Sequence, residues 1–144
     1  MDFGFPVQAS WDKAAHAYQP RVLVADDNPA VQQSTSELLW RWGVTPTLAA
    51  DGAEAVALAC AERYDLILMD VQMPVLDGLT ATKRIRQFEY EHGLPRVPVI
   101  AHTSAAFCLP GRLLPISGVD AVLRKPCDAS ELQECLLRWC PPKP

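Results

Sequence analysis

Polar residues that can take part in chemistry follow four of the hydrophobic runs in this sequence. The runs that begin at Val22, Leu66, Val97 and Val119 lead, in that order, into Asp26 and Asp27, Asp70, Thr103 and Lys125. Phosphoryl transfer requires this kind of set: a metal site, a positive charge, a hydroxyl donor and a carboxylate nucleophile. Clustered carboxylates repel one another unless positive charge compensates them, and the set therefore predicts a Mg²⁺ site.

These side chains meet only if the four runs are strands of one sheet. Short apolar runs bounded by turn signals and separated by helix-length segments are typical of buried parallel strands. In open parallel sheets, ligands bind at the carboxyl ends of the strands. We therefore expect the acids, the hydroxyl and the amine to share one crevice.

Strand and helix signals alternate five times along the chain. The predicted strands are Val22–Ala25, Val44–Leu48, Leu66–Asp70, Val97–His102 and Val119–Leu123. Such units need right-handed crossovers and helices on both faces of the sheet. The sequence therefore predicts an α/β, flavodoxin-like, doubly wound five-stranded parallel sheet of order 2-1-3-4-5, in which the first and third strands are neighbours.

The helices between these strands have recognisable start and stop signals. An apolar stripe of Val31, Thr35, Leu38, Leu39 and Trp42 predicts the first helix, which Gly43 closes. Asp51 and Asp128 have capping-box spacing, and Asp77 begins a third helix. Asp26 or Asp27 is an alternative N-cap for the first helix. Prolines inside residues 105–116 predict a fourth helix that is short or distorted.

The composition is that of an ordinary globular domain. The 144 residues suit one domain, and 49% of them are hydrophobic. The formal net charge of -4 argues against a nucleic-acid-binding surface. No apolar run approaches the ~18 residues of a membrane span, and the first residues lack the features of a signal peptide. We expect a cytoplasmic protein that contacts neither nucleic acid nor membrane.

The five cysteines form no CxxC pair, and their number is odd. Cys135 and Cys140 lie on the apolar stripe of the last predicted helix. Small buried hydrophobic residues in a reducing compartment explain them better than a metal or redox site does.

Four stretches of the chain together resemble the receiver domain of two-component response regulators, and most closely the receivers of hybrid sensor histidine kinases. The matching residues are 22–28, 70–78, 103–105 and 125–126, and the resemblance covers about residues 21–139. The stretch from Met69 to Gly78 is the most specific of them. The expected organisation is an N-terminal extension or linker (1–20), a receiver domain (21–140) and a proline-rich tail (141–144).

The resemblance implies a role for each residue of the site. Asp70 would accept a phosphoryl group from a phosphohistidine on a sensor histidine kinase or a histidine phosphotransfer protein. Thr103 would hydrogen-bond the phosphoryl group, and Lys125 would pair first with Asp70 and then with the phosphoryl oxygens. The bond between Lys125 and Pro126 is a candidate cis peptide.

The resemblance also implies a metal site with oxygen ligands. Asp27 would bind Mg²⁺ directly, together with Asp70 and the backbone carbonyl of Gln72. Asp26 would assist, either directly or through a water molecule. Such a domain is a signalling phosphoacceptor that assists its own phosphorylation and dephosphorylation, and it is not an enzyme in the usual sense.

Three features depart from the family pattern. Val122 stands where the family usually has an aromatic residue whose ring rotates on activation; His102 is a possible substitute or a pH sensor. The unusual fourth helix suggests an uncommon route for the output signal. Trp40 lies opposite the inward stripe of its helix, so either the N-terminal aromatic residues or a partner would cover it.

Other functions remain open at this point. One alternative is a receiver-like interaction module that takes no phosphate. An aspartyl phosphatase is disfavoured because the acids at the first strand are adjacent, whereas such enzymes separate them by one residue. Neither a P-loop nor a GxGxxG motif is present, which disfavours a nucleotide-binding protein. The sequence leaves the oligomeric state, the cognate kinase and the output open.

Overall fold

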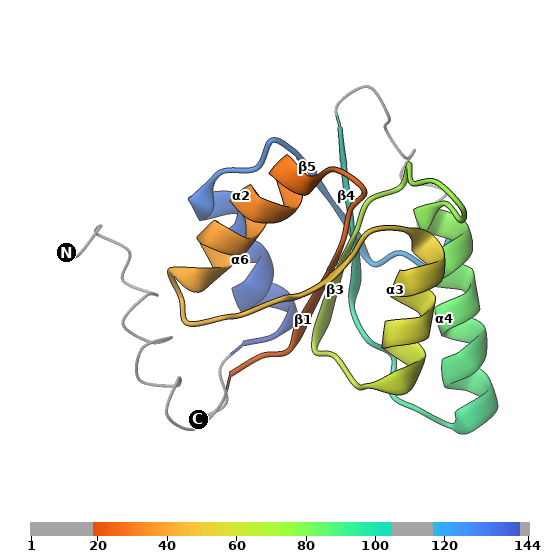
Figure 1. Ribbon diagram of the computed structural model, residues 1–144. Coiled ribbons are helices and arrows are strands. Elements are labelled where there is room, and N and C mark those ends of the chain that lie inside the picture. The colour runs from red at the N-terminus through yellow and green to blue at the C-terminus, as the bar shows by residue number, and fades with distance from the viewer. Residues whose placement is uncertain (1–18, 105–116, 142–144) are drawn as a thin grey trace.

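A computed structural model describes residues 19–104 and 117–141 of the chain. The described elements are β1 (Val22–Ala25), α2 (Pro29–Trp40), β2 (Thr47–Ala49), α3 (Gly52–Ala61), β3 (Leu66–Met69), α4 (Gly78–His92), β4 (Val99–Ser104), β5 (Ala121–Lys125) and α6 (Ala129–Trp139). The strands form one sheet in the order β2-β1-β3-β4-β5, and all of its pairings are parallel (Figure 1). The predicted fold class and strand order are confirmed.

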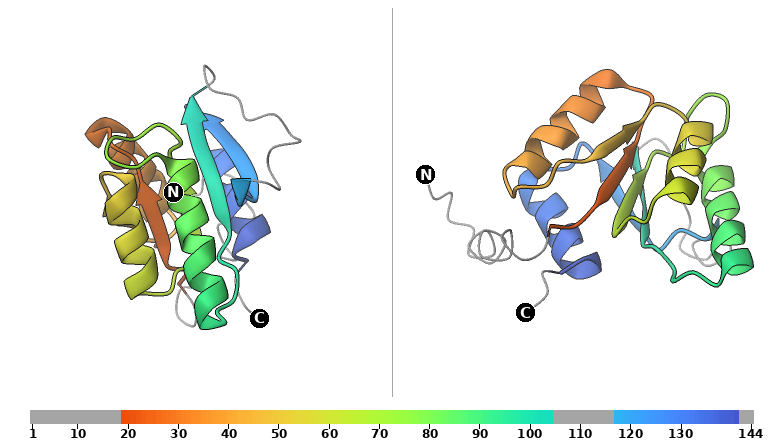
Figure 2. Two further views of the ribbon diagram at one scale, coloured as in Figure 1. Left: turned by 90° about the vertical axis from the view of Figure 1, so that its right-hand side faces the viewer. Right: turned by 60° about the horizontal axis from the view of Figure 1, so that its bottom comes forward.

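Helices cover both faces of the sheet, as the sequence predicts. Helices α2 and α6 lie on one face, and α3 and α4 lie on the other (Figures 1 and 2). Side chains alternate between the faces along each strand: Leu23 and Ala25 join the core under α3 and α4, whereas Val22 and Val24 join the core under α2 and α6. Burial on both faces explains why the strands are continuous hydrophobic runs.

Aliphatic side chains fill the space between the sheet and the helices on each of its two faces. Leu68 and Leu136 are fully buried in the layer of α2 and α6, and each such side chain contributes about 2 kcal/mol of burial free energy. On the other face, the small residues Ala55 and Ala59 let α3 pack closely on the sheet.

Polar side chains cap the described helices at their N-termini. Asp51, Asp77 and Asp128 each accept a hydrogen bond from a backbone N–H in the first turn of the helix that follows. Asn28 caps α2 by accepting from the backbone N–H groups of Ala30 and Val31. The alternative in which Asp26 or Asp27 caps this helix is therefore wrong.

Strands β2, β4 and β5 begin later than the sequence suggests. Val44, Val97 and Val119 are buried in the core, but they precede the residues that pair with neighbouring strands. Apolar side chains just before a strand are therefore indistinguishable from the strand itself by hydrophobicity. At the other end, β4 and β5 continue to Ser104 and Lys125, which are paired with each other.

Several expectations fall on residues outside the described ranges. These are the N-terminal extension up to residue 18, the fourth helix within 105–116 and the tail from residue 142. Trp40 is 54% exposed, in agreement with its predicted outward position, and its coverage by the N-terminal residues stays a prediction. Among the described helices, none is long and apolar enough to cross a membrane.

Candidate functional site

The acids of the site lie side by side because β1 and β3 are neighbours. The backbone N–H of Asp70 donates to the carbonyl of Ala25 (2.9 Å), and that of Asp26 donates to the carbonyl of Ala49 (3.0 Å). These bonds continue the sheet pairing one residue past the strands and fix both backbones. Carboxylate oxygens of Asp26, Asp27 and Asp70 all lie within 4.8 Å of one another. The predicted convergence of the three acids is therefore present.

Lys125 reaches the acids from the end of β5. Its ammonium nitrogen lies 2.5 Å from Asp26 Oδ2 and 3.4 Å from Asp70 Oδ2. Asp26 is only 1% exposed, so its charge needs this partner, because an unpaired buried carboxylate is strongly destabilising. The sequence indicated a contact between Lys125 and Asp70, but it did not reveal that Asp26 is the closer partner.

The two adjacent acids at the end of β1 have different environments. Asp26 is buried, and its Oδ1 accepts from the backbone N–H of Asn28 at 2.9 Å. Asp27 is exposed at the mouth of the site. The side-chain amide of Gln32 donates to the carbonyls of Asp26 (2.6 Å) and Ala49 (3.2 Å), and it thereby ties the first helix to the acid turn. Sequence reasoning missed Gln32, which lies one helical turn after the cap at Asn28.

Burial raises the pKa of Asp70 above the ordinary value of an aspartate. The Lys125 ammonium lowers this pKa, the nearby Asp26 charge raises it, and the backbone N–H of Gln72, 3.3 Å from Oδ1, lowers it. A cation bound beside Asp70 would offset the cost of its ionisation.

Two glycines allow close backbone contacts that hold the loop after Asp70. A Cβ atom on Gly78 would lie 2.0 Å from the carbonyl oxygen of Asp70, and the Gly78 N–H donates to the carbonyl of Val71 at 2.8 Å. A Cβ atom on Gly52 would lie 2.0 Å from the carbonyl oxygen of Leu76. Glycine at position 78 therefore permits the close packing of this loop against Asp70, and Gly52 permits the same packing from α3.

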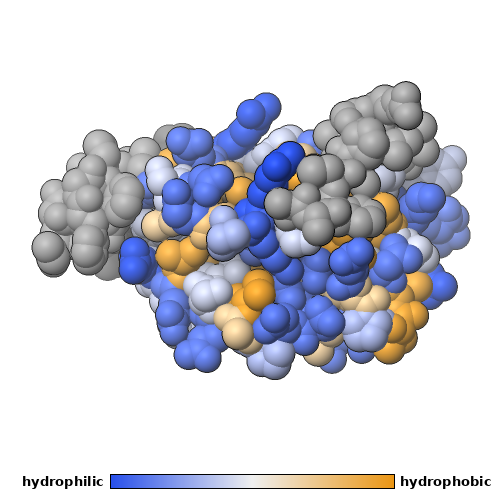
Figure 3. Space-filling model, turned by 90° about the horizontal axis from the view of Figure 1, so that it is seen from above, coloured by the Kyte–Doolittle hydropathy of each residue, from blue (hydrophilic) through white to orange (hydrophobic). Residues whose placement is uncertain are grey.

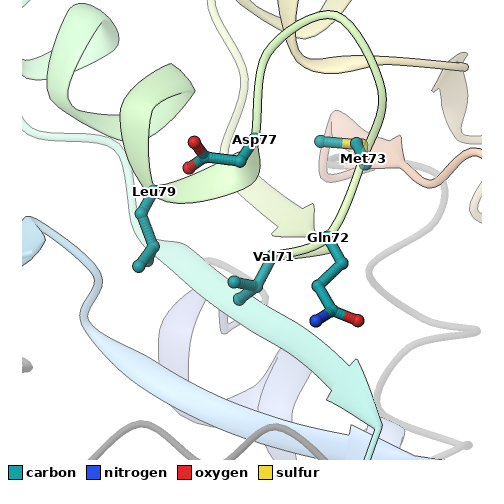
Figure 4. A pocket seen from close by; sticks show the side chains of 5 residues that line it. All are labelled: Val71, Gln72, Met73, Asp77 and Leu79. Carbon is teal, nitrogen blue, oxygen red and sulfur yellow. The ribbon is translucent and has the colours of Figure 1, made fainter.

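An open pocket with a volume of about 560 Å³ lies against the same loop. Figure 4 shows Val71, Gln72 and Met73 leaving β3 on one side of it, and Asp77 and Leu79 at the start of α4 on the other. The side chain of Gln72 is exposed, whereas its backbone lies against Asp70. This backbone is therefore close to the acids, which is what a metal-binding carbonyl at Gln72 would require.

Thr103 and His102 occupy the end of β4. Thr103 is buried and pairs with Arg124 of β5, one position before the pair of Ser104 and Lys125. Its backbone therefore lies at the same end of the sheet as the acids. His102 is 3% exposed, and its Nε2 has no hydrogen-bond partner in the described part of the chain. Burial, aided by the Lys125 charge, lowers the pKa of His102 to about 4, so the ring is neutral at physiological pH.

The donor set of the acid cluster fits a divalent cation. Three carboxylates face one ammonium group, so their charges leave an excess of two negative charges. Asp27 and Asp70 carry carboxylate oxygens, the type of ligand that hard cations such as Mg²⁺ prefer. The Lys125–Pro126 peptide bond next to the site is cis, as predicted.

A second, more apolar hollow adjoins the site on the side of α2. Its volume is about 580 Å³, and it lies between one side of α2 and the ends of β4 and β5. Val31 and Leu38 contribute apolar surface from α2, and Pro126 and Cys127 face them from the segment after β5. Seen from above the strand ends, the described surface is a mosaic of hydrophilic and hydrophobic residues (Figure 3).

The described cysteines are free thiols. Burial raises the pKa of Cys135 to about 11 and that of Cys140 to about 12, so both thiols stay protonated near neutral pH. The prediction of small buried residues is confirmed for Cys140, and Cys135 is half-buried. Cys108 lies outside the described ranges.

Comparison with protein families finds one model that matches most of the chain. It is the response regulator receiver domain, and it matches residues 22–137. Sensor protein GacS of Pseudomonas syringae pv. syringae is 40% identical over 120 residues, which are 83% of this chain and 13% of that protein. Histidine kinase 5 of Arabidopsis thaliana is 31% identical over 144 residues, and the match covers 84% of this chain and 16% of that protein. The chain thus spans a small part of these relatives.

Solved structures of similar fold also include receiver domains. The receiver domain of sensor histidine kinase PA1611 from Pseudomonas aeruginosa PAO1, with magnesium coordinated in its active site cleft, is 40% identical with a TM-score of 0.74. That match covers 85% of this chain and 98% of the other. The complex of the Saccharomyces cerevisiae phosphotransfer protein Ypd1 with the receiver domain of Ssk1 matches with a TM-score of 0.76 and 31% identity, covering 85% and 90% of the two chains.

Proposed function

Because this chain belongs to the receiver domain family of response regulators, we propose that it is a Mg²⁺-dependent phosphoacceptor and that Asp70 receives the phosphoryl group. The contact of Lys125 with both Asp26 and Asp70 is the observation that carries this proposal. A lysine that touches two neighbouring acids is placed to neutralise charge as a phosphoryl group arrives. A structural ion pair would need only one of these acids.

The transfer exchanges one bond to phosphorus for another. An Asp70 carboxylate oxygen attacks the phosphorus of a phosphohistidine, the P–N bond breaks, and the electron pair of that bond returns to the donor imidazole. Asp70 becomes an acyl phosphate. Lys125 then moves its contact towards the new phosphoryl oxygens, and the Thr103 hydroxyl donates a hydrogen bond to one of them.

We assign metal binding to Asp27, Asp70 and the backbone carbonyl of Gln72, with Asp26 assisting. The excess negative charge of the acid cluster supports this assignment. A bound Mg²⁺ supplies positive charge that neutralises the phosphoryl oxygens in the transition state. Asp26 positions the Lys125 ammonium through its Oδ2, and its Oδ1 accepts a hydrogen bond from the N–H of Asn28.

The phosphodonor is a sensor histidine kinase or a histidine phosphotransfer protein. The apolar hollow beside α2 is a suitable place for a helix of such a donor, because it adjoins Lys125 and presents Val31 and Leu38. The similarity to the Ssk1 receiver in its complex with Ypd1 supports a partner of the phosphotransfer class.

Incubation with acetyl phosphate tests the acceptor role without a protein partner. Intact mass spectrometry should detect the addition of one phosphoryl group to the wild-type chain with Mg²⁺, and none with EDTA. Asp70→Asn should remain unmodified, whereas Asp65→Asn, which changes an acid just before β3, should be modified like the wild type. A wild-type chain that stays unmodified would favour the interaction module that takes no phosphate.

A further inference from the structure

Val75 adopts an unusual conformation at the tip of the loop that follows Asp70. Its φ angle is 70°, in the left-handed region that β-branched residues rarely adopt. The backbone N–H of Leu76 donates to the carbonyl of Pro74 at 2.7 Å, which closes a three-residue γ-type turn around Val75. Among the non-glycine residues that the structure describes, no other has a positive φ.

The side chain of Val75 makes few stabilising contacts within the domain that could offset this strain. It is 79% exposed, so the apolar isopropyl group remains in water. Asparagine or glycine would adopt the same backbone conformation more easily and without an exposed apolar group. The folded domain alone therefore gives no reason for valine at this position.

The surrounding loop holds Val75 in a fixed place. The backbone contacts of Gly78 with Asp70 and of Gly52 with Leu76 restrain the loop on both sides. Asp77, two residues after Val75, accepts hydrogen bonds from the N–H and hydroxyl of Thr80 at the start of α4. Val75 is thus an exposed apolar side chain on a restrained turn. A partner that contacted it would lose little free energy to ordering of this loop on binding.

We propose that Val75 is a contact residue for the phosphodonor protein and that it favours a donor with an apolar side chain near its phosphohistidine. This inference rests on the proposed function. Asp70 is only 6% exposed, so a phosphohistidine reaches it only by entering between the loops at the ends of the strands. The loop that carries Val75 begins at Asp70 itself, and a donor of protein size therefore meets this loop.

The proposal predicts a difference between a protein donor and a small-molecule donor. The probe is Ypd1 phosphorylated with phosphoramidate, and the measured quantity is the second-order rate constant for phosphoryl transfer to the full chain with Mg²⁺. Val75→Asn should lower this value about fivefold to tenfold, and Val75→Leu should keep it within about twofold. Labelling by acetyl phosphate should be the same for both variants and the wild type.

Tyr90→Asn is the matched control, because Tyr90 is 86% exposed and lies about 18 Å along α4 from Gly78. This variant should transfer like the wild type. The thermal midpoint of Val75→Asn should rise by roughly 2–5 °C, because asparagine adopts this backbone conformation with less strain. A cooperative melt would also show that the variant is folded.

Three results would overturn the proposal. Equal transfer from phospho-Ypd1 to Val75→Asn and the wild type would show that donors do not use this side chain. An equal loss with acetyl phosphate would place the effect at Asp70 itself. Labelling of the wild type by acetyl phosphate but not by phospho-Ypd1 would show that the surface around Val75 does not accept this protein donor. Failure with both donors would instead contradict the proposed function.

Discussion

At the scale of single residues, the burial of the Asp70 carboxylate destabilises the folded state when no cation is bound. Its pKa in the folded state lies above the unfolded value, so the folded state binds more protons between these two values and stability falls as pH rises through them. Asp70→Asn removes this destabilisation. We expect the variant to melt a few degrees higher than the wild type at pH 7 in EDTA, as calorimetry would show. An unchanged or lower midpoint would contradict the raised pKa.

His102 gives stability the opposite dependence on pH. Its pKa of about 4 lies below the usual value of 6.5, so the unfolded state binds more protons between these values and stability falls as the solution is acidified. The wild type should lose about 2 kcal/mol of unfolding free energy between pH 6.5 and pH 5, and His102→Leu should lose clearly less. Urea titrations at several pH values measure this difference.

The exposed His92 provides the control for that titration. His92→Gln should follow the wild-type curve. If His102→Leu instead loses as much stability on acidification as the wild type does, another group is responsible for the pH dependence.

The identities of the site residues were predictable because each follows an apolar run, but their pairings were not. Asp26 and Asp27 are adjacent in the sequence, and their spacing does not show which one turns inward to meet Lys125. The turn geometry decides this, since the N–H of Asn28 holds Asp26 inside. Hydrophobic patterning likewise marks His102 only as part of a strand, and it does not show that its Nε2 lacks a hydrogen-bond partner among the residues that the structure describes.

At the scale of elements, a charged network fastens α4 to the sheet at the end opposite the acids. The Arg86 guanidinium contacts carboxylates of Glu89 and Asp120, each at 2.9 Å, and donates to the carbonyls of Val97 and Gly118. Glu89 and Asp120 also accept from backbone N–H groups at the beginning of β4. One arginine thus satisfies groups on α4, before β4 and before β5.

Removal of this arginine should weaken the fold more than an ordinary surface change. Arg86→Ala leaves two largely buried carboxylates with fewer partners, and we expect a loss of about 3 kcal/mol in the free energy of unfolding. Arg84→Ala, at an exposed position of the same helix, should change it by less than about 0.5 kcal/mol. Equal effects in urea denaturation would refute the network's role.

The existence and order of the described elements could be predicted from the sequence, whereas some of their boundaries could not. Caps such as Asp77 and Asp128 are local signals, and they place helix starts correctly. The beginnings of β4 and β5 depend on long-range pairing and on the Asp120 network, so Val97 and Val119 look like strand residues although they only fill the core.

At the scale of the whole molecule, parallel topology brings together side chains that are distant in the sequence. Lys125 and Asp26 are 99 positions apart, and yet they form the closest ion pair of the site. A cation bound to the acids at these strand ends should therefore stabilise the entire fold. At ten times the dissociation constant, Mg²⁺ should add about 1.4 kcal/mol to the free energy of unfolding.

Variants of the acid cluster separate this effect from general salt effects. Asp27→Asn should reduce the stabilisation by Mg²⁺, whereas Glu91→Gln, at an exposed position of α4, should preserve it. Thermal melts at constant ionic strength make the comparison. A Mg²⁺ effect that survives Asp27→Asn unchanged would place the cation elsewhere.

Chemical trapping distinguishes an acyl phosphate at Asp70 from any other phosphorylated product. After treatment with acetyl phosphate and Mg²⁺, borohydride reduces an acyl phosphate to an alcohol and so converts the modified aspartate to homoserine. Peptide mass spectrometry should find homoserine at position 70 alone. Homoserine at another acid, or unmodified Asp70 in a chain that has gained a phosphoryl group, would show that Asp70 is not the phosphoacceptor.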